Sequence, residues 1–128
     1  MQDYNIQDVR TAAILTTGYV AGTVLDFNNT NPALRNQLNI LASFTIGSLT
    51  SAQIKVEYSN DGTTYYQDTF EAISGTTSTL SLGEYSIAGT GNYVIQIPIK
   101  AAYIKISAKG TGTVTSSSMA IKAVVGVV

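Results

Sequence analysis

The sequence predicts an all-β fold, an antiparallel β-sandwich of about 8–9 strands, and three observations support this class. Apolar residues make up 45% of the 128 positions and charged residues only 12%, and Thr and Ser fill most of the difference. The 11 Gly and 2 Pro fit short strands joined by tight turns. Several segments alternate apolar and polar residues with a period of two, which is typical of strands with one buried face.

The first strands are expected at residues 11–17 and 19–27, and a polar loop follows at residues 28–32. The next strand has a clearer pattern, because polar residues oppose most of its apolar ones. Those apolar residues are Leu38, Ile40, Ala42, Phe44 and Ile46. A strand with one polar face indicates an antiparallel sheet, because parallel strands are normally covered on both faces.

The central part of the chain predicts a hairpin. Residues 52–59 alternate strictly, and Asn60, Asp61 and Gly62 follow as a turn. The Asp-Gly pair tolerates the positive φ angles that a tight hairpin requires. The return strand is therefore expected at residues 63–70.

The rest of the chain predicts more strands of the same kind. They are expected at residues 77–82, 93–99, 102–109 and 113–127. A second tight hairpin, at residues 109–112, is expected to join the last two strands. The alternation slips at residues 116–118, which predicts a β-bulge within the last strand.

These strands are expected to form two sheets that share one core. A jelly-roll order and an immunoglobulin-like order both fit the pattern. Residues 11–128 are predicted to form this single domain. Residues 1–10 are mostly polar and have too little apolar content to fold alone, so they are expected to be an N-terminal arm that orders on a partner.

The composition argues against an enzyme. The chain has no His and no Cys, so the commonest general base and the thiol nucleophiles are missing. No Ser-x-x-Lys or Gly-x-Ser-x-Gly motif occurs. The 8 acidic residues leave a carboxylate pair open, but most of them fall at turns and on outer faces. We therefore expect no catalytic residues and no cofactor.

Nucleic-acid and membrane partners are not expected either. The net charge is −1 and the basic residues are scattered, whereas nucleic-acid binding needs a basic stripe. No apolar stretch approaches the roughly 20 residues that span a bilayer. Residues 1–5 lack the basic and then apolar run of a secretory signal, so we expect no export signal.

Four oxygen-bearing side chains near the central hairpin are weak candidates for a calcium site: Asn60, Asp61, Asp68 and Glu71. Their spacing matches no EF-hand loop. Turn formation explains Asn60 and Asp61 more simply, and Asp68 and Glu71 are expected to face solvent. We therefore predict no metal site.

Tyrosine is the abundant aromatic residue, with 8 copies and no Trp. Tyr66 and Tyr103 are the side chains expected at the surface, where they could stack on a glycan or enter a partner's pocket. Tyr65 is adjacent to Tyr66 in the sequence, but neighbouring residues of a strand point to opposite faces, so no clustered aromatic pair is expected. The interpretation as ordinary strand aromatics is therefore favoured over a sugar platform.

The two ends of the sequence predict contacts with other subunits. The last six residues are all apolar or Gly, and an uncovered apolar strand invites pairing with a neighbour. The N-terminal arm carries isolated apolar residues. The predicted interface residues are Tyr4, Ile6, Val9, Val124, Val125, Val127 and Val128.

Three segments together resemble a known group of proteins. They are the run from Ile54 to Tyr66 with its Asn-Asp-Gly turn, the later segment Ala102-Tyr103-Ile104-Lys105-Ile106, and the final strand with Met119-Ala120-Ile121-Lys122-Ala123-Val124. This pattern resembles small β-sandwich virion proteins of tailed bacteriophages, which include head decoration proteins and neck or tail components. The resemblance covers roughly the second half of the chain.

The resemblance implies a non-enzymatic structural protein of the virion that decorates or stabilises a capsid in many copies. Its expected partners are other copies of the chain, as a homo-oligomer, and other virion proteins, after synthesis in a bacterial cytoplasm. Two alternatives stay open, a neck or tail accessory protein and a glycan- or receptor-binding module. Discoidin-like carbohydrate-binding modules share the strand and Asn-Asp-Gly hairpin, but usually carry Trp where this chain has Tyr65.

Overall fold

The computed structural model describes residues 6–27 and 37–126. Across this part of the chain it has twelve β-strands and no α-helix. A helix long and apolar enough to cross a membrane is accordingly not found among these residues. Every pair of neighbouring strands is antiparallel. The predicted all-β antiparallel class is confirmed.

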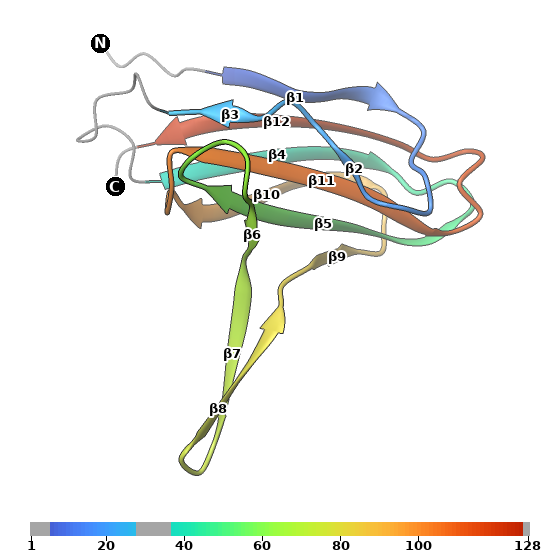
Figure 1. The fold of residues 1–128 in the computed structure, drawn as a ribbon. Helices are drawn as coiled ribbons and strands as arrows, with labels where there is room; N and C mark the ends of the chain where they lie inside the picture. Colours follow the sequence, from blue (N-terminus) through green and yellow to red (C-terminus); the bar gives the residue numbers. More distant parts are fainter. Residues whose placement is uncertain (1–5, 28–36, 127–128) are drawn as a thin grey trace.

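The strands form two facing sheets and a separate ribbon (Figure 1). The first sheet has the order β1 (Ile6–Ala13), β12 (Ser118–Gly126), β4 (Gln37–Thr45) and β10 (Gly91–Pro98). In the second sheet β11 (Tyr103–Gly112) pairs with β5 (Leu49–Ser59); β2 (Val20–Ala21) and β3 (Leu25–Asp26) extend it beside β11, and β6 (Tyr66–Gln67) and β9 (Tyr85–Ile87) beside β5. The ribbon consists of β7 (Thr69–Ser74) and β8 (Thr77–Leu82).

The strand order is that of a jelly roll. β2 and β3 together occupy the position of one strand beside β11, and β6 and β9 together occupy one beside β5. Counted in this way, the sandwich has eight strands in the described part of the chain. Numbered along the sequence, their order is 1-8-3-6 in one sheet and 2-7-4-5 in the other. This double Greek-key order decides between the two predicted alternatives in favour of the jelly roll. The β7–β8 ribbon is an insertion in the fifth strand.

The core lies between the two sheets and follows the predicted alternation. Leu38, Ile40, Ala42 and Phe44 of β4 are buried, as are Ile54, Val56 and Tyr58 of β5 and Ile104, Ile106 and Ala108 of β11. Burying one large apolar side chain contributes roughly 1.5–3 kcal/mol. The predicted inner residues of β10 are covered less well, because Ile97 is buried but Tyr93 is 36% exposed.

The predicted connection between the last two strands is wrong. Residues 109–112 do not turn; they continue β11, which pairs with β5 as far as Gly112. The chain turns at residues 113–117 instead and crosses to the other sheet, so β11 and β12 are not partners. The slip in alternation at residues 116–118 marks this turn and the start of β12, and not a bulge.

The predicted N-terminal arm is also different in the structure. Residues 6–10 belong to β1, which pairs with β12, and Val9 is only 3% exposed. The backbone N–H of Thr23 donates to the carbonyl of Val9 at 2.8 Å, and that of Gly22 donates to Ile106 of the second sheet at 2.9 Å. This segment therefore closes the sandwich along one side. Residues 1–5 of the expected arm lie outside the described residues.

Candidate functional site

The turn after β5 is built by Asp61 and Ser59. One oxygen of Asp61, Oδ1, accepts the backbone N–H groups of Thr63 and Thr64 at 2.8 and 2.9 Å. Buried Ser59 accepts the N–H of Gly62 at 2.9 Å and donates its hydroxyl to Asp61. These bonds, led by the one from Thr64, lower the pKa of the Asp61 carboxyl from its usual value. Asp61 thus organises the turn.

The other calcium candidates lie in different environments. Asp68 forms an ion pair with Lys100, with Nζ 2.9 Å from Oδ1. Glu71 accepts a hydrogen bond from the hydroxyl of Ser78 across the β7–β8 ribbon, and Asn60 is exposed. No group of three or more acidic residues suited to a metal ion occurs in the described part of the chain. The structure therefore does not assemble these residues into one site.

Tyr66 and Tyr103 lie on opposite faces of the second sheet. Tyr66 pairs with Tyr58, which pairs with Ile104, so these three side chains share the core-facing side. Tyr103 precedes Ile104 in β11 and therefore points to the outer side. Tyr66, at the sheet edge, is 70% exposed, whereas Tyr103 is half-buried and lies under the turn at Gly62. They do not form one flat aromatic platform.

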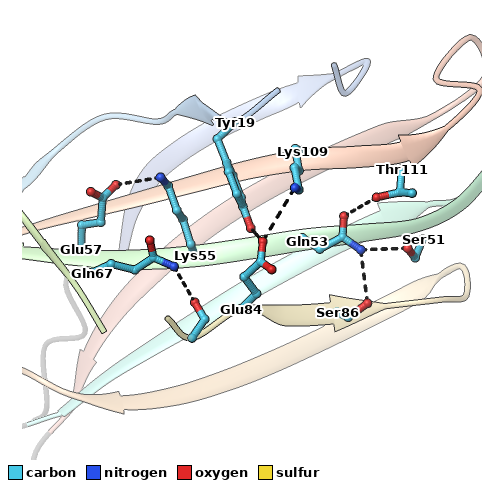
Figure 2. A network of polar contacts seen from close by, with 11 residues as sticks. Tyr19, Ser51, Gln53, Lys55, Glu57, Gln67, Glu84, Ser86, Lys109 and Thr111 are labelled. Atoms are coloured by element: carbon cyan, nitrogen blue, oxygen red, sulfur yellow. Dashed lines mark hydrogen bonds and ion pairs between the residues drawn. The ribbon is translucent and has the colours of Figure 1, made fainter. Parts of the chain in front are cut away.

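The outer face of the second sheet carries a polar network (Figure 2). Lys55 and Lys109 form cation–π contacts with the ring of Tyr19, and their Nζ atoms lie 4.6 and 4.8 Å from its centroid. Its hydroxyl donates to Glu84, which lies 3.8 Å from Lys109. Gln53 continues the network by donating to Ser51 and Ser86 and accepting from Thr111.

The groups of this network bind one another. Burial, and then the hydrogen bond and the negative charge of Glu84, raise the pKa of the Tyr19 phenol. Tyr19 therefore stays protonated and donates to Glu84 at neutral pH. No buried side-chain nitrogen or oxygen lacks a partner within residues 6–27 and 37–126. The arrangement favours a structural role, in which the network holds the 14–19 segment onto the sheet.

The predicted interface residues at the two termini divide into three groups. Ile6 is 58% exposed at the start of β1, opposite the half-buried Val124. Val9 and Val125 pack on the chain's own core instead, so Val9 in particular is not available to a partner. Tyr4, Val127 and Val128 lie outside the described residues. Of the four predicted interface residues that the structure describes, only Ile6 is therefore largely exposed.

A larger apolar surface lies on the β7–β8 ribbon, here called the hairpin (residues 69–82). All its strand residues are exposed. Its four large apolar side chains are Phe70 (49% exposed), Ile73 (72%), Leu80 (66%) and Leu82 (68%). The register pairs Thr69 with Leu82, Glu71 with Leu80 and Ile73 with Ser78. Ile73, Leu80 and Leu82 therefore share one face of the ribbon.

The sequence predicts the strand at residues 77–82 correctly but not the exposure of the hairpin. The expected strand at residues 63–70 is broken, since β6 ends at Gln67 and β7 starts at Thr69. At that break the N–H of Asp68 donates to Val56 at 2.9 Å and the N–H of Gly83 to Asp68 at 2.8 Å. The sequence gives no local signal of this exposure, because β8 alternates Leu with Ser and Thr as a core strand does.

A second exposed feature is the free edge of β10. This strand pairs with β4 on one side, and no backbone hydrogen bond reaches its other side from the described residues. It carries no charged residue over its eight positions. Val94 on its outer face is 66% exposed and lies beside Leu41, which is 40% exposed. Long uncharged edges of this kind readily pair with other strands.

Comparisons with known proteins find a similar fold among solved structures. No protein-family model and no curated protein matches the chain. Among solved structures, the crystal structure of PBSX exported protein XepA is similar, with a TM-score of 0.62, 12% sequence identity and coverage of 97% of this chain. The chain spans 37% of the length of that XepA chain.

A chain from the Bacillus endospore appendages, described as disulfide-linked pili, has a TM-score of 0.47 at 6% identity. That match covers 98% of this chain and 89% of the other. At 12% identity, the likeness to XepA shows a shared β-sandwich fold.

Proposed function

We propose that this chain is a non-enzymatic structural protein of a bacteriophage-type virion, where it binds in many copies and decorates or stabilises the particle. The observation that carries the proposal is the hairpin, a two-stranded ribbon with four exposed large apolar side chains. A two-stranded ribbon alone is marginally stable in water. Apolar side chains concentrated on such a projection indicate an interaction site.

Three further observations support the proposal. The chain has no His or Cys, and the carboxylates near its turns and on its polar face are engaged in turns, ion pairs or hydrogen bonds. The sequence resembles small β-sandwich virion proteins, and the jelly-roll order is one that capsid proteins use. Part of the exported protein XepA has a similar fold, and a protein that leaves its producing cell fits a component of a released particle.

The test is co-sedimentation with particles. A tagged copy would be produced in cells that form the particles, and the lysate would be separated on a density gradient. We expect the tagged chain to sediment with the particle fraction. If it stays at the top of the gradient with unassembled protein, the virion role is wrong.

A shortened variant makes the test specific for the hairpin. Replacing residues 70–81 by Asn-Gly joins Thr69 to Leu82 through a two-residue turn and leaves the sandwich strands unchanged. We expect this variant to keep its β circular-dichroism spectrum and to lose the particle fraction. Ile14→Ser is the matched control, because Ile14 is 56% exposed and belongs to neither the hairpin nor β10. Sedimentation of the shortened variant at the wild-type level would contradict the role of the hairpin.

A further inference from the structure

Two uncharged free edges occur on the same chain, on β8 and on β10. Among strands of six or more residues that stand at the end of a sheet or ribbon in the described ranges, β1 carries Asp8 and Arg10, and β7 carries Glu71. β8 and β10 carry no charge, over six and eight residues. Charged residues on an edge protect it from pairing with another chain. These two edges lack that protection and have similar lengths.

The hairpin is held so that it points away from its own β10. Its base is fixed by the hydrogen bonds of Asp68 and Gly83 and by the packing of Phe70 on Tyr85. Figure 1 shows the ribbon projecting from the sandwich, with its tip at the far end. A contact between β8 and β10 is therefore possible only between two molecules.

We propose that β8 of one copy pairs with the free edge of β10 of a second copy, so that the hairpin extends the four-stranded sheet of its neighbour. This inference rests on the proposed multi-copy assembly and names the contact that produces it. Leu80 and Leu82 of the hairpin then lie beside Val94 and continue the exposed apolar row that Leu41 and Val94 form. Backbone hydrogen bonds supply affinity, and the apolar row supplies register.

Electrostatics does not oppose this contact. Neither strand places a charge in the new interface, and the net charge of −1 gives little repulsion between copies. The donor and the acceptor are different surfaces of the molecule, so the contact is head-to-tail. Such a contact generates a ring where the rotation closes and a filament where it does not.

The head-to-tail geometry gives a complementation test with two lysine variants, Leu80→Lys in the hairpin and Val94→Lys in the edge. Both residues are exposed, so both variants are expected to fold, which circular dichroism checks. The wild-type chain should show a molar mass that rises with concentration in light scattering. Each variant alone should stay near 13.5 kDa. Their equimolar mixture should reach about twice that mass, because one intact hairpin then meets one intact edge.

Ile14→Lys is the control and should assemble as the wild type does. A mixture of the two variants that stays monomeric, or a Val94→Lys variant that assembles normally, overturns the proposed contact. A wild-type chain that stays monomeric at all concentrations also overturns it. The virion role is tested separately by co-sedimentation, so a monomer that still sediments with particles rejects this contact and leaves that role intact.

Disulfide trapping gives an independent readout, because the natural chain has no Cys. A Leu80→Cys copy and a longer, tagged Val94→Cys copy would be mixed under mild oxidation. The expected product is the mixed dimer. A dimer formed by Leu80→Cys with itself instead would show hairpin-to-hairpin contact and overturn the proposal.

Discussion

The ring of Phe70 stands edge-on to the ring of Tyr85, with centroids 6.0 Å apart and an interplanar angle of 88°. Phe70 belongs to the hairpin and Tyr85 to β9 of the sandwich, so this pair joins the projecting ribbon to the core domain. Gly83 lies between them in sequence, and a Cβ at that position would come within 2.9 Å of the Phe70 ring. Together with the backbone hydrogen bonds at Asp68 and Gly83, this aromatic contact and this glycine fix the direction of the hairpin.

Replacing Phe70 by Ala is expected to loosen the hairpin while the sandwich stays folded. An edge-to-face aromatic pair contributes about 0.5–1.5 kcal/mol beyond its buried area. Amide hydrogens of residues 69–82 should then exchange faster, by roughly fivefold for 1 kcal/mol, while those of β4 and β5 keep their protection. Hydrogen exchange with mass spectrometry measures this. Ile73→Ala, near the ribbon tip, is the control, and equal exchange in the two variants would contradict the role of Phe70.

Replacing Gly22 by Ala is expected to open the side of the sandwich that the 20–27 segment closes. A Cβ on Gly22 would lie 2.4 Å from the Val9 carbonyl oxygen and 2.6 Å from its Cγ1. Overpacking of this kind costs about 1–3 kcal/mol, which a urea unfolding curve measures. Gly18→Ala is the matched control, since nothing lies within 4 Å of a Cβ there. A urea midpoint for Gly22→Ala at or above that of Gly18→Ala would contradict this prediction, because it would show that Val9 moves away from the new Cβ without a cost in stability.

The period-two alternation predicts the fold class because the long strands of the sandwich, such as β4 and β5, bury alternate residues. It identifies the inner residues of β4, β5 and β11 correctly. It does not determine strand order, because the jelly-roll and immunoglobulin-like orders need the same alternation. Turn positions are predicted less reliably than strands. Gly110 and Gly112 resemble turn residues, yet Gly110 is buried where a side chain would meet Leu49, and Gly112 has a positive φ of 104° at the end of β11.

The exposed apolar surface is harder to predict than the fold, because the exposure of a residue depends on strands that are distant in sequence. Val9 has polar neighbours in the sequence and is therefore predicted to belong to an arm, but in the structure β12 and the Thr23 backbone cover it. Leu80 and Leu82 alternate with polar residues as core residues do, but no second sheet lies over β8. The local pattern is the same in both cases, and only the long-range pairing separates them.

Replacing Ser117 by Ala is expected to destabilise the turn that carries the chain from one sheet to the other. Its hydroxyl accepts the buried N–H of Leu15 at 3.2 Å and donates to the Val114 carbonyl at 2.7 Å. The variant leaves the Leu15 N–H without this acceptor, which costs about 1–3 kcal/mol. Thermal and urea unfolding measure the loss. Exposed Ser116 provides the control Ser116→Ala, and equal stabilities of the two variants would contradict the role of Ser117.

Replacing Asp61 by Ala is expected to weaken the turn after β5 at neutral pH and to have a smaller effect in acid. The bonds from Thr64 and Thr63 lower the pKa of the carboxyl in the folded state, whereas the pKa of Asp in an unfolded chain is about 3.9. The ionised group therefore stabilises the fold above that pH, and this contribution is lost as the pH falls through the lowered folded value. The stability gap between wild type and Asp61→Ala should narrow below about pH 4.

Urea midpoints of both proteins between pH 7 and pH 2 measure this gap, and other titrating groups cancel in the comparison. Asp61→Asn keeps an acceptor oxygen but carries no charge, so its difference from Asp61→Ala should not depend on pH in this range. A gap between wild type and Asp61→Ala that stays constant or widens in acid would mean that the charge of Asp61 does not stabilise the turn. Calcium should leave all three midpoints unchanged, because Asp61 Oδ1 is already engaged by the backbone.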